Sequence, residues 1–280
     1  MSGPCSSFTA PRLPDLPRPA NLFYPGGVKS ASPSDVDQWV RAVEARHSTE
    51  LSFQEIRRGI QALSWRYVER RAERGLGATL DGRGKRAAFA LFYAPLHLIV
   101  VRHIVEALQS PAAAPPALLD LGCGTGVGAA AWTLASEAPR PALTGVDVHP
   151  WAVAECRWNW RSLGLRGHVR RADLRTLDPG DLSRAGVVAA FAFNEIPGEA
   201  RDRWLRILVT APRRPARLLV VEPIARRAAP WWDTWATAVT DAGGRADTWE
   251  LHPALPDPLP ALDKAAGLSH KILKARSLWL

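Results

Sequence analysis

The segment Leu118–Gly128 has the sequence LLDLGCGTGVG. Its first residues predict a short buried strand that ends at Leu121, and a helix is expected to begin after the glycines. Glycine has no Cβ, so it lets the backbone turn sharply and come close to a ligand at a helix N-terminus. We therefore expect a ligand-binding loop here, formed by Gly122, Gly124 and Gly126.

Two features of this loop distinguish between the ligands that it could bind. The GxGxxG spacing of dinucleotide-binding loops would need glycine at position 127, where this chain has Val127. Asp120 precedes the first glycine by two residues, and its carboxylate would repel a pyrophosphate. The same carboxylate would attract a cationic amino group. The loop therefore favours a ligand that contains an amino-acid moiety.

Two more aspartates follow at the ends of the next expected strands. Asp147 lies about 20 residues after the loop, where a carboxylate can accept hydrogen bonds from both hydroxyls of a ribose. Asp173 follows the third strand in the sequence RADL and can accept a hydrogen bond from an adenine amino group. Together the three carboxylates match a ligand with an ammonium group, a ribose and an adenine.

Around the loop, short apolar runs alternate with helical segments, which is typical of a mainly parallel sheet with helices on both faces. The expected strands are Ala117–Leu121, Ala142–Asp147, Gly167–Arg170, Val187–Phe193, Arg217–Glu222, Ala246–Leu251 and Arg276–Leu280. The expected helices are Val127–Glu137, Pro150–Leu163, Gly198–Val209 and Pro230–Ala242. We therefore expect an α/β fold, a Rossmann-like doubly wound sheet over residues 117–280, with ligands beyond the carboxyl ends of the strands.

The segments LLDLGCGTG, TGVDVHP and RADL resemble the cofactor-binding series of class I S-adenosylmethionine-dependent methyltransferases. The resemblance covers about Ala117 to Leu280. It implies a seven-stranded sheet whose last strand is antiparallel, with S-adenosyl-L-methionine as cofactor and S-adenosyl-L-homocysteine as product. The residues that it places at the cofactor are Asp120, Gly122, Cys123, Gly124, Gly126, Asp147, Val148, Asp173, Leu174 and Asn194. Cys123 is expected to be a small wall residue rather than a nucleophile.

The fourth expected strand leads into the sequence NEIPGEA. In the methyltransferases that the chain resembles, this point lies next to the sulfonium group of the cofactor. The resemblance therefore implies that Asn194, Glu195 and Pro197 border the methyl-transfer site. Glu195 is our candidate catalytic residue, as a base or as a group that orients the acceptor; the alternative is that it caps the next helix or contacts solvent. Asn194 and Pro197 alone match the NPPY-type motif, so an amino-group target is not inferred. Glu222, at the end of the fifth strand, is a candidate for the lining of the acceptor pocket.

The chain before the sheet differs in character. Residues 1–33 contain seven prolines and little periodicity, which predicts an extended or partly disordered arm. Residues 34–112 have a helical pattern, in which Ser52 and Glu55 form a capping box. A last helical stretch, Lys85–Leu108, contains Pro95, which is expected to kink or divide it. We interpret residues 34–112 as a helical substrate or cap module.

The stretch Lys85–Leu108, KRAAFALFYAPLHLIVVRHIVEAL, is similar to the AYxxxRxPxxY-like helix of the methyltransferase-like family of small-ribosomal-subunit assembly factors. The segments FNEIP and VVEP also resemble parts of that family. Tyr93 and His97 share one face of this helix and either line the acceptor site or pack beneath the sheet. The chain lacks the cysteine set that holds an iron–sulfur cluster in many members, so no cluster is implied.

The composition bears on partners and location. The chain has 36 basic and 27 acidic residues, and 31 of the basic residues are arginine, which can grip phosphates. The alternative is a coding bias, since Ala and Pro are also frequent. Cys5, Cys123 and Cys156 have no metal-binding spacing, so no metal site is expected. The apolar run Ala87–Val101 falls short of a membrane span, and no secretory signal is recognised, so we expect a cytoplasmic protein.

The sequence is consistent with three functions. The first is a methyltransferase that acts on RNA, with ribosomal RNA or the small ribosomal subunit as partner. The second is a methyltransferase that acts on a small molecule, which the absence of an added RNA-binding domain allows. The third is an assembly factor that keeps the cofactor pocket without turnover.

Overall fold

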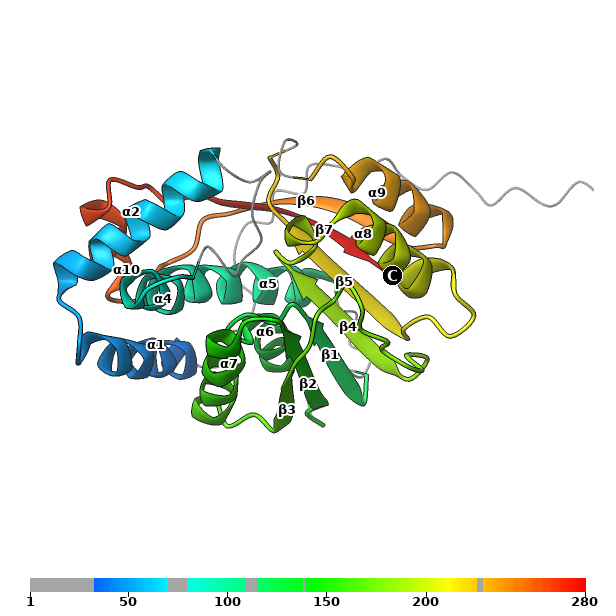
Figure 1. Ribbon diagram of the computed structural model, residues 1–280, viewed down its shortest axis with the longest axis horizontal. Helices are drawn as coiled ribbons and strands as arrows, with labels where there is room; N and C mark the ends of the chain where they lie inside the picture. The colour runs from blue at the N-terminus through cyan, green and yellow to red at the C-terminus, as the bar shows by residue number, and fades with distance from the viewer. Residues whose placement is uncertain (1–32, 70–79, 109–114, 138, 226–228) are drawn as a thin grey trace, which may run out of the picture.

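The computed structural model describes residues 33–69, 80–108, 115–137, 139–225 and 229–280 (Figure 1). The arm expected at residues 1–33 lies outside the described residues apart from Pro33, as does most of the linker before the sheet.

Within the described residues, seven strands form one sheet in the order β3-β2-β1-β4-β5-β7-β6. The strands are β1 (Ala117–Leu121), β2 (Ala142–Asp147), β3 (Gly167–Arg171), β4 (Ala185–Ala190), β5 (Arg217–Glu222), β6 (Arg245–Leu251) and β7 (Leu273–Trp279). Strands β1 to β5 pair in parallel, and β7 lies antiparallel between β5 and β6. The Rossmann-like sheet with an antiparallel last strand is confirmed.

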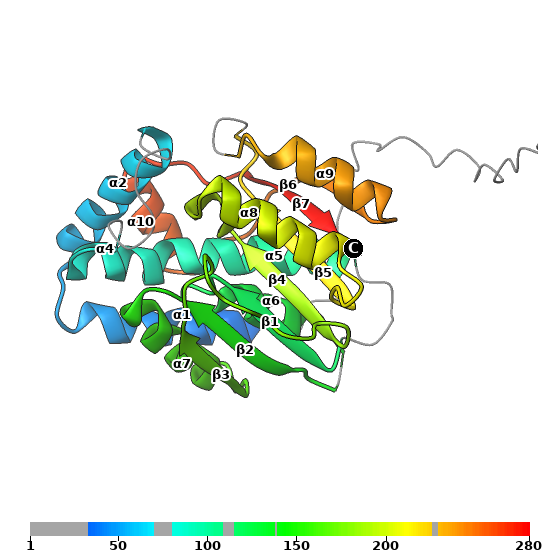
Figure 2. The same cartoon turned by 45° about the vertical axis from the view of Figure 1, so that its right-hand side comes forward.

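Helices cover both faces of the sheet, as Figures 1 and 2 show. On one face, α6 (Val127–Ala135) and α7 (Pro150–Ser162) pack with the N-terminal helices in one core cluster. On the other face, α8 (Gly198–Leu205), the short π-helix η3 (Arg206–Thr210) and α9 (Trp232–Asp241) cover a second cluster. The ends of the parallel strands thus remain available for a site.

The fourth strand is shorter than the sequence pattern predicts. It ends at Ala190, and the prediction that it continues to Phe193 is wrong. Phe191 has a φ of 59°, a left-handed conformation that an extended strand does not have. A 3-10 turn, η2 (Phe193–Glu195), follows directly. The apolar residues after Ala190 are therefore buried in a turn, which periodicity alone does not distinguish from a strand.

The N-terminal helices are α1 (Pro33–Ser48), α2 (Phe53–Glu69), α4 (Arg83–Ala88), the π-helix η1 (Phe89–Tyr93) and α5 (Ala94–Leu108), and α10 (Leu259–Ala265) packs beside them. The capping box forms, since Ser52 N donates to Glu55 Oε2 at 2.8 Å. Trp39 on α1 donates from Nε1 to Asn159 Oδ1 on α7 at 2.9 Å. The helices and one face of the sheet share a single core cluster. The module is therefore built onto the sheet.

Pro95 does not divide its helix. Arg83–Leu108 is one continuous helix of 26 residues. The π turn just before Pro95 lets Ala94 N donate to Phe89 O, five residues back. Pro95 has no N–H and follows directly on this turn, so the missing bond is absorbed where the helix is already widened. The helix is long and apolar enough to cross a membrane by length and composition, but 78% of its apolar window is buried inside the protein, as in the core helix of a globular fold.

Candidate active site

The loop between β1 and α6 turns through three glycines. Gly122, Gly124 and Gly126 have φ values of 66°, 51° and 82°. A Cβ on Gly122 would lie 2.7 Å from Cβ of Ala192, and one on Gly126 would lie 2.4 Å from Sγ of Cys156. Both positions therefore require glycine on account of backbone conformation and space.

Side chains of β2 and α7 form hydrogen bonds with the backbone of this loop. Asp147 accepts hydrogen bonds from Gly124 N at 2.9 Å and from His149 N at 2.7 Å. Asn159 donates to Thr125 O at 2.9 Å, and Trp160 donates from Nε1 to Gly126 O at 2.8 Å. Sequence reasoning missed the roles of Asn159 and Trp160, because nothing in their spacing links α7 to a loop more than 30 residues earlier.

Asp120 lies under the loop with 1% of its surface exposed. Its Oδ2 accepts a hydrogen bond from Ala129 N at 2.8 Å, at the start of α6. Burial raises the pKa of Asp120 to about 7, and this one backbone hydrogen bond offsets the effect only in part. A buried carboxyl group of this kind becomes a stable anion when a cation binds beside it.

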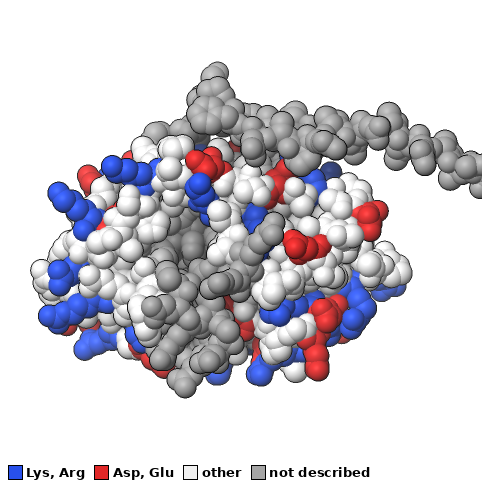
Figure 3. Space-filling view, turned by 90° about the horizontal axis from the view of Figure 1, so that it is seen from above, with Lys and Arg blue, Asp and Glu red and all other residues white. Residues whose placement is uncertain are grey.

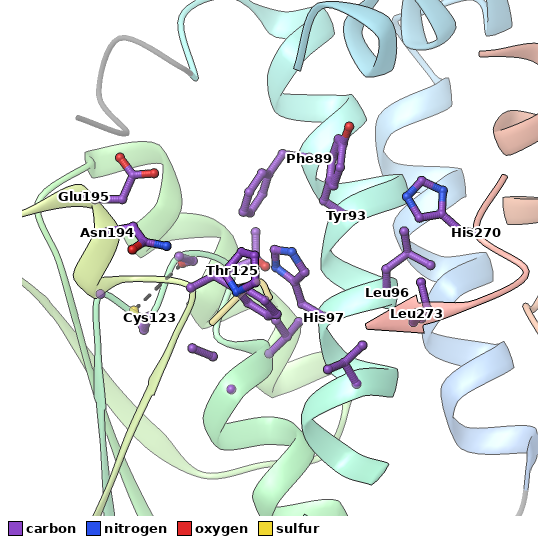
Figure 4. A pocket seen from close by; sticks show the side chains of 18 of the residues that line it. Phe89, Tyr93, Leu96, His97, Cys123, Thr125, Asn194, Glu195, His270 and Leu273 are labelled. Atoms are coloured by element: carbon purple, nitrogen blue, oxygen red, sulfur yellow. Dashed lines mark hydrogen bonds between the residues drawn. The ribbon is translucent and has the colours of Figure 1, made fainter. Parts of the chain in front are cut away.

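A cavity of about 350 Å³ extends from this loop to the N-terminal helices (Figure 4). The described residues that line it are Ser64, Phe89, Tyr93, Leu96, His97, Val100, Asp120, Gly122, Cys123, Gly124, Thr125, Val127, Gly128, Ala190, Phe191, Asn194, Glu195, Pro223, His270, Ile272, Leu273 and Lys274. Figure 4 shows Asn194 and Glu195 on the side opposite Tyr93 and His270. The cavity therefore joins the glycine loop, the end of β4, helix η1–α5 and the start of β7.

Several residues singled out in the sequence meet at this cavity. Those that line it are Tyr93, Asp120, Gly122, Cys123, Gly124, Asn194 and Glu195. Gly126, Asp147, Val148, Asp173, Leu174, Pro197 and Glu222 do not line it. His97 also lines the cavity. For His97, as for Tyr93, the sequence left open whether the side chain lines the acceptor site or packs beneath the sheet.

The residues expected to bind the ribose and the adenine lie at or just after the ends of β2 and β3 and do not line the cavity. Val148 is 45% exposed directly after Asp147, while Leu174 is buried. Asp173 accepts three hydrogen bonds from Arg175, from the backbone N at 2.9 Å, from Nε at 2.8 Å and from Nη2 at 2.5 Å. These bonds hold the pKa of Asp173 below its ordinary value. Its carboxylate is thus already engaged by a neighbour in the loop.

Cys123 is a buried free thiol. A hydrogen bond with Cys156 and burial raise its pKa well above the ordinary value. Because only the thiolate is a strong nucleophile, this environment disfavours nucleophilic catalysis. Its position fits the expected wall residue.

The expectation that Glu222 lines the acceptor pocket is wrong, because Glu222 is completely buried at the end of β5 and is not among the residues that line the cavity. It accepts hydrogen bonds from Phe193 N at 3.1 Å and from Asn194 Nδ2 at 2.5 Å. Burial, and to a smaller extent Glu195, raises its pKa to about 8. Glu222 therefore acts on the cavity through Asn194. Pro197 is exposed and lies directly before α8.

The site fits the cofactor that the sequence implies. Asp120 is a buried carboxyl group at the cavity that can receive an ammonium group. Thr125 Oγ1 is buried and has no hydrogen-bond partner among the described residues, so it can bond a polar ligand atom. Gly122 and Gly124 line the cavity with backbone atoms alone, because glycine has no side chain, and both have positive φ values. In the part of the chain that the structure describes, no cluster of His, Cys, Asp or Glu suits a metal ion.

The comparisons with known proteins agree with this site. Residues 118–212, which contain the glycine loop and the strand ends, match the family model described as a methyltransferase domain. No curated protein matches. Residues 118–212 are thus identified as a methyltransferase domain. S-adenosylmethionine, the cofactor that the sequence implies, is a methyl donor that fits the site described above.

Three solved structures illustrate the likeness. The [4+2]-cyclase SpnF is 19% identical, with a TM-score of 0.43 over 64% of this chain and 79% of that one. The tRNA (uracil-54, C5)-methyltransferase of Pyrococcus abyssi with bound S-adenosyl-L-homocysteine is 14% identical, with a TM-score of 0.41 over 66% and 38%. Magnesium protoporphyrin IX methyltransferase from Synechocystis PCC 6803 with bound SAM is 14% identical, with a TM-score of 0.43 over 86% and 95%.

Proposed function

We propose that this protein transfers a methyl group from S-adenosylmethionine to RNA in the cytoplasm, with ribosomal RNA or the small ribosomal subunit as its partner. The observation that carries the proposal is the cavity, in which the glycine loop faces aromatic residues of the N-terminal helix. Enzymes that modify a base take it out of the stack and hold it between aromatic or apolar side chains. Phe89, Tyr93 and Phe191 offer such walls.

The residues of the chain then have separate roles. Asp120, Gly122 and Gly124 would hold the amino-acid end of the cofactor, and Asp147 and Val148 would hold its nucleoside. When bound, S-adenosylmethionine supplies an activated methyl group, so the protein mainly needs to align the acceptor and exclude water. Glu195 lines the cavity next to Asn194 and would orient the acceptor or take its proton.

Charge outside the cavity supports an anionic partner. The net charge is +9. Figure 3 shows Lys and Arg side chains gathered at the end of the molecule where α2 and α10 lie. Exposed basic residues of these elements and their neighbours are Arg58, Arg83, Lys264 and Lys271. Arg171, also exposed, donates to Val148 O at 3.0 Å beside the expected nucleoside site.

A competition experiment tests this proposal. Binding to labelled ribosomal RNA is measured at about 150 mM salt, because any basic protein binds RNA at low salt. Small-subunit particles or ribosomal RNA should compete better than an equal mass of unrelated RNA. Transfer of a radioactive methyl group to that RNA should follow, and Glu195→Gln should lower its rate more than it lowers cofactor affinity. Equal competition and no methylated RNA would contradict the proposal, and specific binding without transfer would indicate an assembly factor.

A specific observation favours a small-molecule acceptor as the second candidate. Among the described residues that line the cavity, Lys274 is the sole Lys or Arg, and its Nζ is paired with Glu250 at 2.7 Å. The interior therefore offers little to a phosphate. Methylation of a compound in a metabolite extract, without methylated RNA, would support this candidate.

A further inference from the structure

One face of the helix Arg83–Leu108 points into the cavity. Phe89, Tyr93, Leu96, His97 and Val100 all line it. Phe89 and Tyr93 lie at the two ends of the π turn η1, and His97 follows one turn later. A π turn holds more than four residues, so residues four apart come onto one face there. The widened helix thus presents three rings to the cavity, and their centroids lie 6.1 to 6.4 Å from one another.

A strained aromatic residue packs against this face of the helix. Phe191 is the one non-glycine residue with positive φ among those that the structure describes. This conformation is strained for a bulky side chain, and such strain is concentrated at functional sites. It places the Phe191 ring parallel to His97, with 4.0 Å between ring centroids and 23° between their planes.

His97 is held as a neutral imidazole at the cavity. Burial lowers its pKa to about 3. Its ring packs against Phe89, Tyr93 and Phe191. No described residue makes a hydrogen bond to either of its ring nitrogens, although it lines the cavity (Figure 4). His97 is partly buried, and a neutral imidazole offers one donor and one acceptor nitrogen to a ligand in the cavity. The stack on Phe191 covers a face of the imidazole, so its nitrogens are available at the ring edge.

We propose that His97 contacts the methyl acceptor, and that the acceptor is a neutral planar aromatic ring whose polar edge hydrogen-bonds the imidazole in the chamber formed by Phe89, Tyr93, His97 and Phe191. The walls favour a flat ring because aromatic pairs stack or meet edge to face. They favour a neutral ring because an apolar chamber does not replace the hydration of a charge. This inference rests on the proposed function and names the acceptor class, a nucleobase or a small aromatic molecule.

Binding of small probes tests the inference without cofactor or RNA, so failure of RNA methylation does not affect it. The full chain is titrated with indole, quinoline and naphthalene, which have similar flat shapes but differ at the ring edge. We expect indole or quinoline to bind at least about tenfold more tightly than naphthalene, on the scale of one hydrogen bond to a buried group. In His97→Phe, which keeps an aromatic ring, this preference should disappear.

His103→Phe is the matched control, because His103 lies on the same helix and meets Trp249 rather than the cavity. It should keep the preference of the wild type. A second readout does not depend on any variant: the imidazole nitrogen NMR signals of His97 should shift when the preferred probe is added. No binding of any probe, equal binding of naphthalene by the wild type, or a preference retained in His97→Phe would overturn the inference.

Displacement of the bound probe distinguishes between the two sources of the aromatic ring, which are RNA and a free small molecule. Ribosomal RNA that displaces the bound probe would show that the chamber accepts a nucleobase within RNA. Displacement by a metabolite extract but not by RNA would support a free aromatic molecule. Displacement by neither would overturn the assignment of this chamber as the acceptor site.

Discussion

Asn194 donates a hydrogen bond from Nδ2 to Glu222 Oε2 at 2.5 Å, across the ends of two neighbouring strands. Trp231 Nε1 donates to the other end of the same amide, Oδ1 of Asn194, at 3.1 Å. The Asn194 side chain lines the cavity, and these two bonds set its orientation there. A buried residue that never faces the cavity thus positions one that does.

Replacement of Glu222 by glutamine is expected to break this arrangement. Both Glu222 oxygens accept hydrogen bonds, and a carboxyl oxygen keeps acceptor capacity even when protonated, whereas Nε2 of the glutamine would oppose a donor. We expect Glu222→Gln to lower the free energy of unfolding by about 1–3 kcal/mol, the cost of an unsatisfied buried polar group. Urea unfolding measures this. Glu199→Gln, at an exposed position, should change it by less than about 0.5 kcal/mol. Equal stability of wild type and Glu222→Gln would contradict the positioning role.

The pKa of Glu222 makes stability depend on pH. Its pKa is about 8 in the folded protein and 4.5 at its ordinary value, so the folded state holds this proton more tightly than the unfolded chain. The contribution is fully present below about pH 4.5 and is lost as the pH rises to about 8. The stability advantage of wild type over Glu222→Gln should therefore be larger at pH 5 than at pH 8. A difference that grows with pH would show that folding lowers the pKa of Glu222 instead of raising it.

Asp120 should make cofactor binding depend on pH. Burial raises the pKa of Asp120 to about 7 in the ligand-free protein, and only the ionised form attracts an ammonium group. The affinity for S-adenosylmethionine should therefore rise between pH 6 and pH 7.5, by up to roughly 1.4 kcal/mol for one pKa unit. Calorimetry of Asp120→Asn should show weaker binding without this rise. Asp181→Asn, an exposed control, should behave like the wild type; the same pH profile in Asp120→Asn would refute the assignment.

Asp147→Ala should weaken S-adenosylmethionine binding by about 2–4 kcal/mol, the scale of losing charge-assisted hydrogen bonds. The structure adds a reason beyond the ribose, since Asp147 also holds Gly124 N in the loop. Asp147→Asn keeps one acceptor oxygen and should lose less affinity than Asp147→Ala. Calorimetry that finds wild-type affinity in Asp147→Ala, or tighter binding of NAD by the native protein, would contradict this cofactor site.

Trp160→Phe tests the support of the loop from α7. Phenylalanine retains most of the packing but cannot donate to Gly126 O. We expect a loss of about 1–2 kcal/mol in stability and a matching loss of cofactor affinity. Trp158→Phe is the control, because Trp158 meets Arg46 on α1 and not the loop. Affinity unchanged in Trp160→Phe would mean that the loop keeps its shape without this bond.

The sequence by itself determined those features that depend on near neighbours in the chain. The strand–glycine–helix spacing at Leu118–Gly128, the alternation of strands and helices and the capping box at Ser52 are local patterns, and local sterics and hydrogen bonding produce them. The positions of Asp120 and Asp147 at strand ends follow from the same alternation. The local patterns predict the structure incorrectly at two places. At Pro95 a π turn keeps one helix continuous, and at Phe191 the chain turns although the apolar run continues.

Only the tertiary structure decided which side chains meet at the cavity. His97 and Phe191 stack although 94 residues separate them, and Glu222 reaches Asn194 instead of the acceptor side. Such contacts depend on how a helix packs against strand ends and on which groups lose water there. Burial and long-range hydrogen bonds have no fixed spacing along the chain, so no local pattern encodes them.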